Sequence, residues 1–301
     1  MTMQFSTPVQ IPASQRPIRY SDHILMLGSC FADNIAEQMS EYYFQITANP
    51  FGTLYNPVSI ANALALTRMP ELVEWGGLFH SMYHHGAFSS SDKEQTCRSV
   101  EQSIGRMQQA WAEASVVIIT FGTAWVYERN GMVVANCHKL PASQFTRRRL
   151  SVEDIVGVWQ PILAAYPDKQ FIFTVSPIRH IKDGLHQNQL SKATLLLAID
   201  QLLDSHTAYF PSYEIMLDEL RDYRFYADDM FHPSPLAVRY IWQRFADTYI
   251  EADTRGEMQT LHQLYLDRHH TLLHPDSPQS QAFLARLEER TASHRLRYPW
   301  I

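Results

Sequence analysis

The chain has 301 residues, of which 46% are hydrophobic, and it carries a formal net charge of −6. This size and composition are typical of one large globular domain, or of one domain with an appendage. The acidic balance argues against nucleic acid as a main partner. No apolar run approaches the ~18 residues that a membrane span requires, so we expect no membrane partner.

The predicted elements begin with a strand over about 24–28 and a helix over about 30–41. An apolar run ends at Gly28, and apolar residues then recur at four-residue spacing, which predicts one buried helix face. Ser29 therefore lies at a strand-to-helix turn. Free backbone N–H groups and the positive end of the helix dipole favour a developing anion there, although a serine at this position can equally be a simple helix cap.

Further strands and helices alternate along the chain. The expected strands are 43–47, 115–121, 170–175 and 213–217, and the expected helices are 58–67, 98–113, 151–165, 188–210 and 235–250. A hairpin over 125–136 is expected around the Asn-Gly turn at 130–131. Residues 70–97 are expected to be irregular, and the basic cluster 147–149 to be a solvated helix entrance. The alternation predicts an α/β fold with a parallel sheet between two layers of helices.

Residues 251–301 differ in composition, because Arg, Glu, His and Gln dominate there. We predict a helical C-terminal appendage over 251–301 and a main domain over 1–250. The N-terminus lacks the basic start and apolar run of a secretory signal peptide. Three widely spaced cysteines fit a reducing compartment better than a disulfide framework, so the sequence predicts a cytoplasmic protein.

The most informative motif is an acid three residues before a histidine, Asp229 and His232, after the fifth expected strand. Sites in such folds gather in the loops beyond the C-terminal strand ends. The carboxylate can hold the imidazole tautomer and leave the other ring nitrogen free to take a proton from a serine. Alone, the motif is more often an ordinary helix start. Together with Ser29 it predicts a Ser-His-Asp triad.

Several segments resemble the GSCFA domain family, which is similar to a branch of the SGNH/GDSL hydrolases. Leu-Gly-Ser-Cys-Phe-Ala at 27–32 contains the motif after which the family is named. The other segments that resemble the family are 49–52, 120–125, 136–139, 176–180 and 229–232. The resemblance implies a flavodoxin-like three-layer sheet. It also implies Ser29 as nucleophile, His232 as general base and Asp229 as the acid that orients it.

The resemblance further implies that the backbone N–H groups of Ser29 and Gly52 stabilise the oxyanion. The superfamily's third block usually reads Gly-x-Asn-Asp, and its Asn side chain gives a further hydrogen bond. Here the block reads Gly-Thr-Ala-Trp at 122–125, so that donor is missing. The candidates to replace it are Asn136, then His138, then Thr123.

Other residues have a functional and a plain structural interpretation. Cys30 adjoins Ser29 and is an alternative nucleophile, although a cysteine is commonly a small buried hydrophobe. His80, His84 and His85 could bind zinc on a helix. Neighbouring glycines make a helix doubtful, so we expect these histidines to line a pocket and expect no metal or cofactor.

Arg179 and His180 follow the fourth expected strand, where they could neutralise a charged group of the substrate or pair with Asp183. Bulky aromatic side chains such as Trp125 would narrow the pocket and favour a short acyl group. The predicted function is a serine esterase that acts on a short O-acyl ester, for example an acetylated carbohydrate or a cell-envelope precursor. The alternatives are acyl transfer with the same triad, a non-catalytic carbohydrate-binding module on a hydrolase scaffold and, least favoured, a zinc enzyme.

Overall fold

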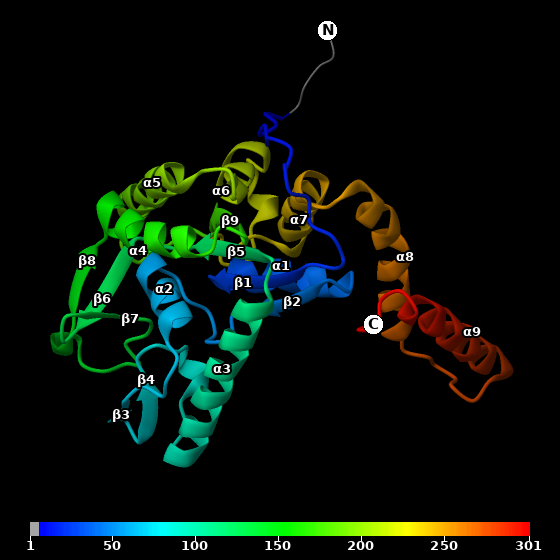
Figure 1. Ribbon diagram of the computed structural model, residues 1–301, viewed down its shortest axis with the longest axis horizontal. Helices are drawn as coiled ribbons and strands as arrows, with labels where there is room; N and C mark the ends of the chain where they lie inside the picture. The colour runs from blue at the N-terminus through cyan, green and yellow to red at the C-terminus, as the bar shows by residue number, and fades with distance from the viewer. Residues whose placement is uncertain (1–5) are drawn as a thin grey trace, which may run out of the picture.

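The computed structural model describes residues 6–301 (Figure 1). A five-stranded sheet with the order β10-β9-β5-β1-β2 forms its centre, and every pair in it is parallel. The strands are β1 (His23–Gly28), β2 (Gln45–Ala48), β5 (Val116–Phe121), β9 (Gln170–Val175) and β10 (Thr207–Phe210). Counted along the chain, this is the 2-1-3-4-5 order of flavodoxin-like sheets. The predicted α/β fold is confirmed.

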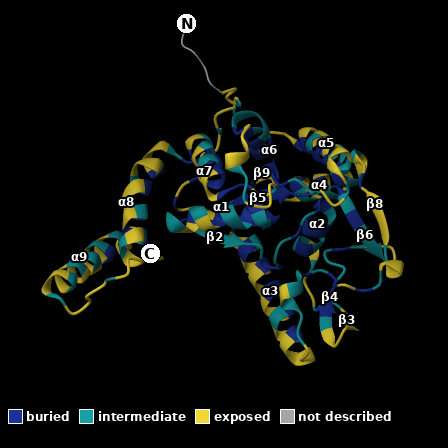
Figure 2. Ribbon diagram, turned by 180° about the vertical axis from the view of Figure 1, so that it is seen from behind, coloured by how far each residue is buried: buried dark blue, intermediate teal, exposed yellow. Residues whose placement is uncertain are grey.

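Helices cover both faces of the sheet, and each face has its own apolar core (Figure 2). The helices are α1 (Cys30–Glu41), α2 (Pro57–Ala65), α3 (Lys93–Glu113), α4 (Val152–Ala165), α5 (Leu185–Leu202), α6 (Ser212–Glu214), α7 (Pro235–Tyr249), α8 (Ala252–Arg268) and α9 (Pro278–Arg295). One core joins α1 and α7 to the sheet, and the other joins α2, α3, α4 and α5. Because both faces are covered, β5 and β9 are buried along their whole length, which explains their unbroken apolar sequences.

Two small antiparallel sheets correct the sequence interpretation. Within the segment expected to be irregular, β3 (Leu72–Trp75) and β4 (Leu78–Ser81) form a hairpin. Its turn is made by Gly76 and Gly77, which both have positive φ, a conformation that glycine adopts without strain. α3 then starts at Lys93, five residues earlier than expected.

The second small sheet has the order β7-β6-β8 and consists of β6 (Trp125–Arg129), β7 (Met132–Val134) and β8 (Thr146–Arg149). The expected hairpin is confirmed. The basic cluster 147–149 belongs to a strand, however, and not to a helix entrance. Arg148 on β8 pairs across the strands with Glu128 at 2.8 Å, so cross-strand contacts satisfy this charge.

The fifth strand of the main sheet is β10, not the predicted segment 213–217. α5 ends at Leu202 because a turn follows it, in which the Asp204 carboxylate accepts hydrogen bonds from the N–H groups of His206 and Thr207. The segment 213–217 is helical. A short apolar run fits a strand or a buried helix equally well.

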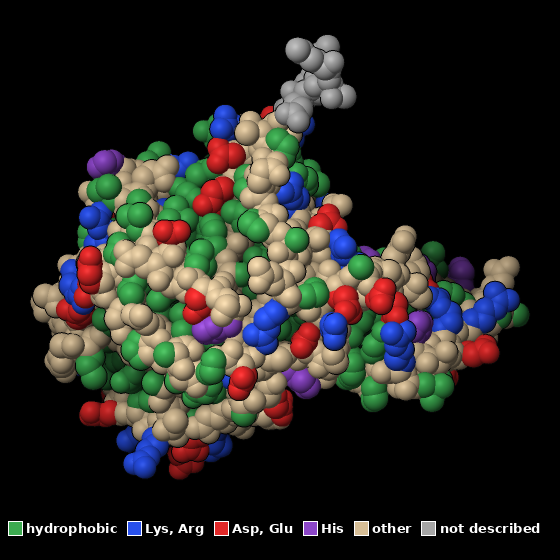
Figure 3. All heavy atoms as spheres, turned by 45° about the horizontal axis from the view of Figure 1, so that its top comes forward, with side chains coloured by type: hydrophobic (Ala, Val, Ile, Leu, Met, Phe, Trp, Pro, Cys, Tyr) green, Lys and Arg blue, Asp and Glu red, His purple; other side chains and the backbone are tan. Residues whose placement is uncertain are grey.

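The C-terminal segment is helical, as predicted. α8 contributes Met258, Leu261 and Leu264 to the core that contains α7, whereas α9 projects from the body beside α8 (Figure 1). Acidic and basic side chains lie interspersed over these helices (Figure 3). The division of the chain at residue 250 stays a prediction. Within residues 6–301, no helix combines the length and the apolar character needed to cross a membrane.

Candidate active site

Hydrogen bonds join the loops beyond the C-terminal strand ends into one edge. The Asn49 side chain accepts the N–H of Gly28 at 2.8 Å, and the N–H of Leu54 donates to the Gly28 carbonyl at 2.9 Å. The N–H of Gly122 donates to the carbonyl of Tyr55 at 2.8 Å. The loops after β1, β2 and β5 therefore hold one another in place.

Lys192 on α5 extends this edge to the loop after β9. Its Nζ donates to the carbonyls of Gly122 at 2.8 Å and Ser176 at 2.6 Å, and the residue is only 1% exposed. Burial, and then the charge of Arg179, lower the pKa of Lys192 to about 7. Sequence reasoning missed this residue. The signal was a lysine on the apolar face of α5, one turn before Leu195, because lysine is seldom fully buried.

Asp229 and His232 lie in the loop between β10 and α7, and the structure brings them together. The His232 Nδ1 is 2.6 Å from the Asp229 Oδ2, while Oδ1 accepts the N–H groups of Phe231 at 2.9 Å and His232 at 3.0 Å. The N–H of His232, followed by that of Phe231, lowers the pKa of Asp229 to about 2. The carboxylate is therefore ionised at neutral pH and holds the Nδ1 proton, which leaves Nε2 as an acceptor.

This pair adjoins the loop after β9. The N–H of Arg179 approaches the carbonyl of Phe231 at 3.5 Å. Burial, followed by the charges of Lys192 and His232, lowers the pKa of His180 to about 4. His232, with 47% of its side chain exposed, thus lies at the rim of the edge formed by the strand-end loops.

Ser29 is the N-cap of α1, but its hydroxyl does not reach His232 in this structure. The residue is 0% exposed, and its buried Oγ has no hydrogen-bond partner among the described residues. The expected hydrogen bond between Ser29 and His232 is therefore not made. In the turn before it, Gly28 has a φ of +137°, and a Cβ there would lie 2.1 Å from the Thr120 carbonyl oxygen. The Ser29 N–H donates to that same carbonyl at 3.3 Å.

Cys30, the next residue, is the first of α1 and is partly exposed. Burial and the charge of Asp33 raise the pKa of its thiol. Hydrogen bonds from the N–H groups of Cys30 and Phe31, and the charge of Lys192, act in the opposite direction. The thiol therefore lies at the N-terminus of α1, on a residue that packs against the core joining α1 and α7 to the sheet.

The two expected oxyanion donors are both engaged in other bonds. The N–H of Ser29 is bonded to Thr120, and the N–H of Gly52 donates to the Asn49 carbonyl at 2.8 Å. Gly52 has a φ of +76°, and a Cβ there would lie 2.4 Å from the Cβ of His85. The loop therefore needs glycine for its backbone conformation and close packing, and the expected donor role is not met in this conformation.

The first two candidates for the missing third donor are bound locally. Asn136 accepts the N–H of His138 through Oδ1 at 2.8 Å, and its Nδ2 lies beside Gly86. His138 Nε2 is 2.8 Å from the carbonyl of Ser81, which can only accept, so Nε2 carries the proton. Burial lowers the pKa of His138 to about 4. The neutral ring has no proton on Nδ1, which corrects its proposed donor role.

The third candidate holds a loop in place. The Thr123 hydroxyl is 3.1 Å from the Ser191 Oγ on α5 and accepts the N–H of Trp125 at 3.1 Å. The Arg147 guanidinium lies over the Trp125 ring, with its Cζ 4.4 Å from the ring centroid. These contacts fix the loop after β5 between α5 and the β7-β6-β8 sheet.

Arg179 and His180 do not pair with Asp183, which corrects the structural alternative. Asp183 instead pairs with Arg147 at 2.6 Å. The Nε of Arg179 and the Nε2 of His180 are buried, and neither has a hydrogen-bond partner among residues 6–301. A role of the two residues in binding a charged group of the substrate stays a prediction.

The histidines of the 80–86 segment support the fold. His84 bridges the hydroxyls of Ser81 at 2.7 Å and Ser103 at 2.8 Å, and His80 is 2.7 Å from the hydroxyl of Ser89. Across the described part of the chain, no group of three or more His, Cys, Asp and Glu side chains is arranged to hold a metal ion.

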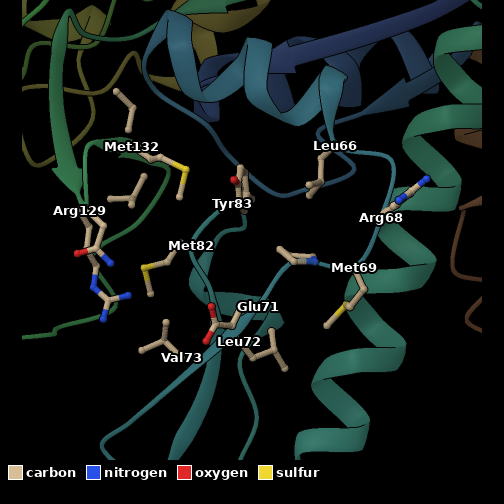
Figure 4. A pocket seen from close by; sticks show the side chains of 14 residues that line it. Leu66, Arg68, Met69, Glu71, Leu72, Val73, Met82, Tyr83, Arg129 and Met132 are labelled. Atoms are coloured by element: carbon tan, nitrogen blue, oxygen red, sulfur yellow. The ribbon is translucent and has the colours of Figure 1, made fainter.

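A cavity of about 530 Å³ lies away from these residues, between the loop after α2, the β3–β4 hairpin and the β6–β7 turn (Figure 4). Its walls include Met69, Met82 and Met132 together with Arg129. The predicted site residues, all of them within the described range, are not among those that line it.

The family model described as the GSCFA family matches residues 23–245, which is more than half of the chain. The chain belongs to the GSCFA family. The match spans β1 to α7 and therefore includes the turn at Ser29 and the pair of Asp229 and His232. No curated protein matches this GSCFA chain.

Two solved structures are similar to the GSCFA chain. One is a carbohydrate esterase family 3 from Talaromyces cellulolyticus, with 8% identity, a TM-score of 0.36 and coverage of 80% of this chain and 98% of that one. The other is a carbohydrate esterase family 2 enzyme plus carbohydrate-binding domain from Corynascus thermopiles (Myceliophthora fergusii). It has 13% identity, a TM-score of 0.35 and coverage of 83% of this chain and 69% of that one.

Proposed function

We propose that this protein is an ester hydrolase that cleaves short O-acyl esters through a covalent acyl-enzyme intermediate. The observation that carries the proposal is the contact of 2.6 Å between Asp229 and His232. This pair is partly exposed and adjoins the C-terminal edge of a parallel sheet, where the active sites of such folds gather.

In this proposal, His232 transfers the protons. Asp229 stays ionised because two backbone N–H groups and the imidazole bind it. It fixes the tautomer, so Nε2 can accept the nucleophile's proton and later return it to the leaving alcohol. The nucleophile lies at the β1–α1 turn, where the sequence predicts Ser29 and where Cys30 is adjacent.

The same turn supplies stabilisation for the developing negative charge. The N–H groups of the first helical turn have no intrahelical partner, and the helix dipole places positive charge there. The N–H groups of Cys30 and Phe31 belong to this first turn. They support an oxyanion site that does not depend on the engaged N–H groups of Ser29 and Gly52.

The acyl group in this proposal is short. Tyr55 approaches His180 edge to face, with ring centroids 6.2 Å apart, and Trp125 follows the loop after β5. The Tyr55 ring takes up space beside His180, so we expect an acetyl group to fit better than a long chain. An acetylated sugar is one natural form of such an ester.

A series of 4-nitrophenyl esters from acetate to octanoate, assayed with and without EDTA, tests the proposed function. We expect the acetate to be cleaved at least roughly tenfold faster than the octanoate, because each extra methylene must find space in the pocket. EDTA should leave the rates unchanged. A preference for octanoate, or loss of turnover in EDTA, would contradict the proposal. Binding of acetylated sugars without any turnover would indicate the binding-module alternative.

A further inference from the structure

Buried polar atoms without a hydrogen-bond partner gather in the loop after β9 and at the start of α5. They are the Nε of Arg179, the Nε2 of His180 and the Nδ2 of Asn188, which have no partner among residues 6–301. The cluster is held together from within, because the N–H of His180 donates to the Oδ1 of Asn188 at 2.9 Å. Buried polar groups in native proteins are nearly always paired. Three orphaned atoms in one place therefore indicate a site for a further polar group.

The chemistry of these atoms defines what the further group must be. The Nε of an arginine and the Nδ2 of an asparagine can only donate, so both require an acceptor. Burial, followed by the charges of Lys192 and His232, lowers the pKa of His180 to about 4, so its ring is neutral at neutral pH and brings no charge. The Tyr55 ring holds it edge to face, with the centroids 6.2 Å apart. The group that completes the cluster is therefore rich in acceptor atoms.

The cluster also carries a positive charge without a counterion. Arg179 forms no ion pair within the described part of the chain, because the neighbouring carboxylates are engaged: Asp183 pairs with β8 at 2.6 Å, and Asp229 pairs with His232. Lys192, whose charge acts on Arg179, bonds only to backbone carbonyls. A cation that is withdrawn from water without a counterion is costly. An acceptor group with a negative charge is therefore favoured here.

The cluster adjoins the proposed general base. The N–H of Arg179 approaches the carbonyl of Phe231, the residue before His232, at 3.5 Å. Arg179 and His180 are both partly exposed, as is the His232 side chain. An ester bound at His232 thus has one of its two ends beside the cluster. Since the proposed acyl group is short, this end is the alcohol part.

We infer that Arg179 and Asn188 bind an anionic group on the alcohol part of the ester, and this inference rests on the proposed function. The guanidinium supplies a charge and a planar fork of N–H groups that matches a carboxylate or a phosphate. The amide of Asn188 supplies a further N–H. The preferred substrates are then acetyl esters of alcohols that carry one of these anions, such as hydroxy acids, acidic sugars and sugar phosphates.

Hydrolysis of 4-acetoxybenzoate and of 4-acetoxybenzamide, which are alike in shape but differ in charge, tests the inference. We expect kcat/KM of the wild type to be at least roughly tenfold higher for the benzoate, because charged hydrogen-bonded pairs are stronger than neutral ones. A third ester, 4-acetoxyphenyl phosphate, distinguishes the two anions. A higher kcat/KM for it than for the benzoate assigns the site to a phosphate, and the reverse assigns the site to a carboxylate.

Three variants locate the effect. In Arg179→Gln the preference for the benzoate should fall to none, mainly through a higher KM, because an interaction made in both the ground state and the transition state is lost. Asn188→Asp keeps the acceptor for the His180 N–H but replaces the donor with a carboxylate, so it should also lose the preference. Arg224→Gln is the matched control and should keep the wild-type ratio. Arg224 is an exposed arginine between β10 and α7 that pairs with Asp222 at 2.9 Å.

Binding of benzoate and benzamide, compared at equal ionic strength, needs neither turnover nor a variant. Benzoate should raise the melting temperature of the wild type with increasing concentration, whereas benzamide should not. Equal effects of the two compounds would overturn the inference. So would equal rates for the charged and neutral esters, and this result would leave the hydrolase standing if 4-nitrophenyl acetate is cleaved. Equal losses for both esters in Arg179→Gln would also overturn it, because the guanidinium would then not act through the anion. No turnover of any ester would overturn the proposed function and the inference with it.

Discussion

The protein should lose less stability between pH 7 and pH 5 when His84 is replaced with glutamine. His84 is 0% exposed, and burial lowers its pKa from 6.5 to about 3. The unfolded chain therefore binds this proton at a higher pH than the native state. The contribution of His84 to stability is fully present above its unfolded pKa and is lost as the pH falls below 6.5 towards 3.

The magnitude follows from the two pKa values. At pH 5 an unfolded histidine is about 1.5 pH units below its pKa, whereas buried His84 is still neutral. At about 1.36 kcal/mol per pH unit, protonation of the unfolded chain lowers the free energy of unfolding by about 2 kcal/mol. The effect reaches the candidate site, because the His84 ring stacks on Phe51, 4.1 Å away and next to Gly52.

Urea unfolding at pH 7 and pH 5 measures this difference in the wild type, His84→Gln and Ser103→Ala. The glutamine variant should lose about 2 kcal/mol less than the wild type between the two pH values. Ser103→Ala removes a hydrogen-bond partner of His84 but keeps the imidazole, so its pH dependence should follow that of the wild type. Equal losses in His84→Gln and the wild type would refute the reasoning.

Three further predictions concern the site. Asp229→Asn should lower kcat/KM for 4-nitrophenyl acetate by roughly a hundredfold or more, because the imidazole loses its orienting carboxylate. The neighbouring Asp228→Asn should not have this effect. Equal effects would exclude a specific role of Asp229 in orienting His232. Wild-type protein should gain about 2 kcal/mol in the free energy of unfolding from pH 7 to pH 9, and Lys192→Met should lose this gain. The native pKa of Lys192, about 7, lies below the ordinary value of 10.5, so stability rises with pH between the two values. Urea unfolding in both buffers shows whether the variant keeps the gain. Asn136→Ala should cost about 1 kcal/mol of stability, because the bond to the His138 N–H is lost. It should lower kcat less than tenfold. A hundredfold fall would instead indicate that Asn136 is an oxyanion donor.

The sequence predicts the central sheet well where burial is continuous. β5 and β9 are buried on both faces, so each appears as an apolar run that periodicity identifies directly. The β1–α1 turn is equally clear, because the period of apolar residues changes from one element to the next at Gly28. The motif of Asp229 and His232 is local, so its spacing alone predicts a contact that the structure shows.

Features that depend on long-range contacts were not predictable. The basic strand β8 is held in place by pairing with β6, for example through Arg148 and Glu128, which are 20 residues apart in sequence. The composition of β8 gives no apolar signal. The backbone bond from the Ser29 N–H to the Thr120 carbonyl joins residues that are distant in sequence. The hydrogen bonds of Lys192 were not predictable for the same reason, since its carbonyl partners come from two other loops.

The most direct test of the proposed function is the turnover of 4-nitrophenyl acetate by the wild type and by His232→Gln at neutral pH. The account predicts steady hydrolysis by the wild type and a fall of roughly a hundredfold or more in the variant, as the loss of a general base produces. Circular dichroism and urea unfolding should show an unchanged fold. Equal rates in two folded proteins would contradict the assignment of His232 as the base, and with it the proposed mechanism.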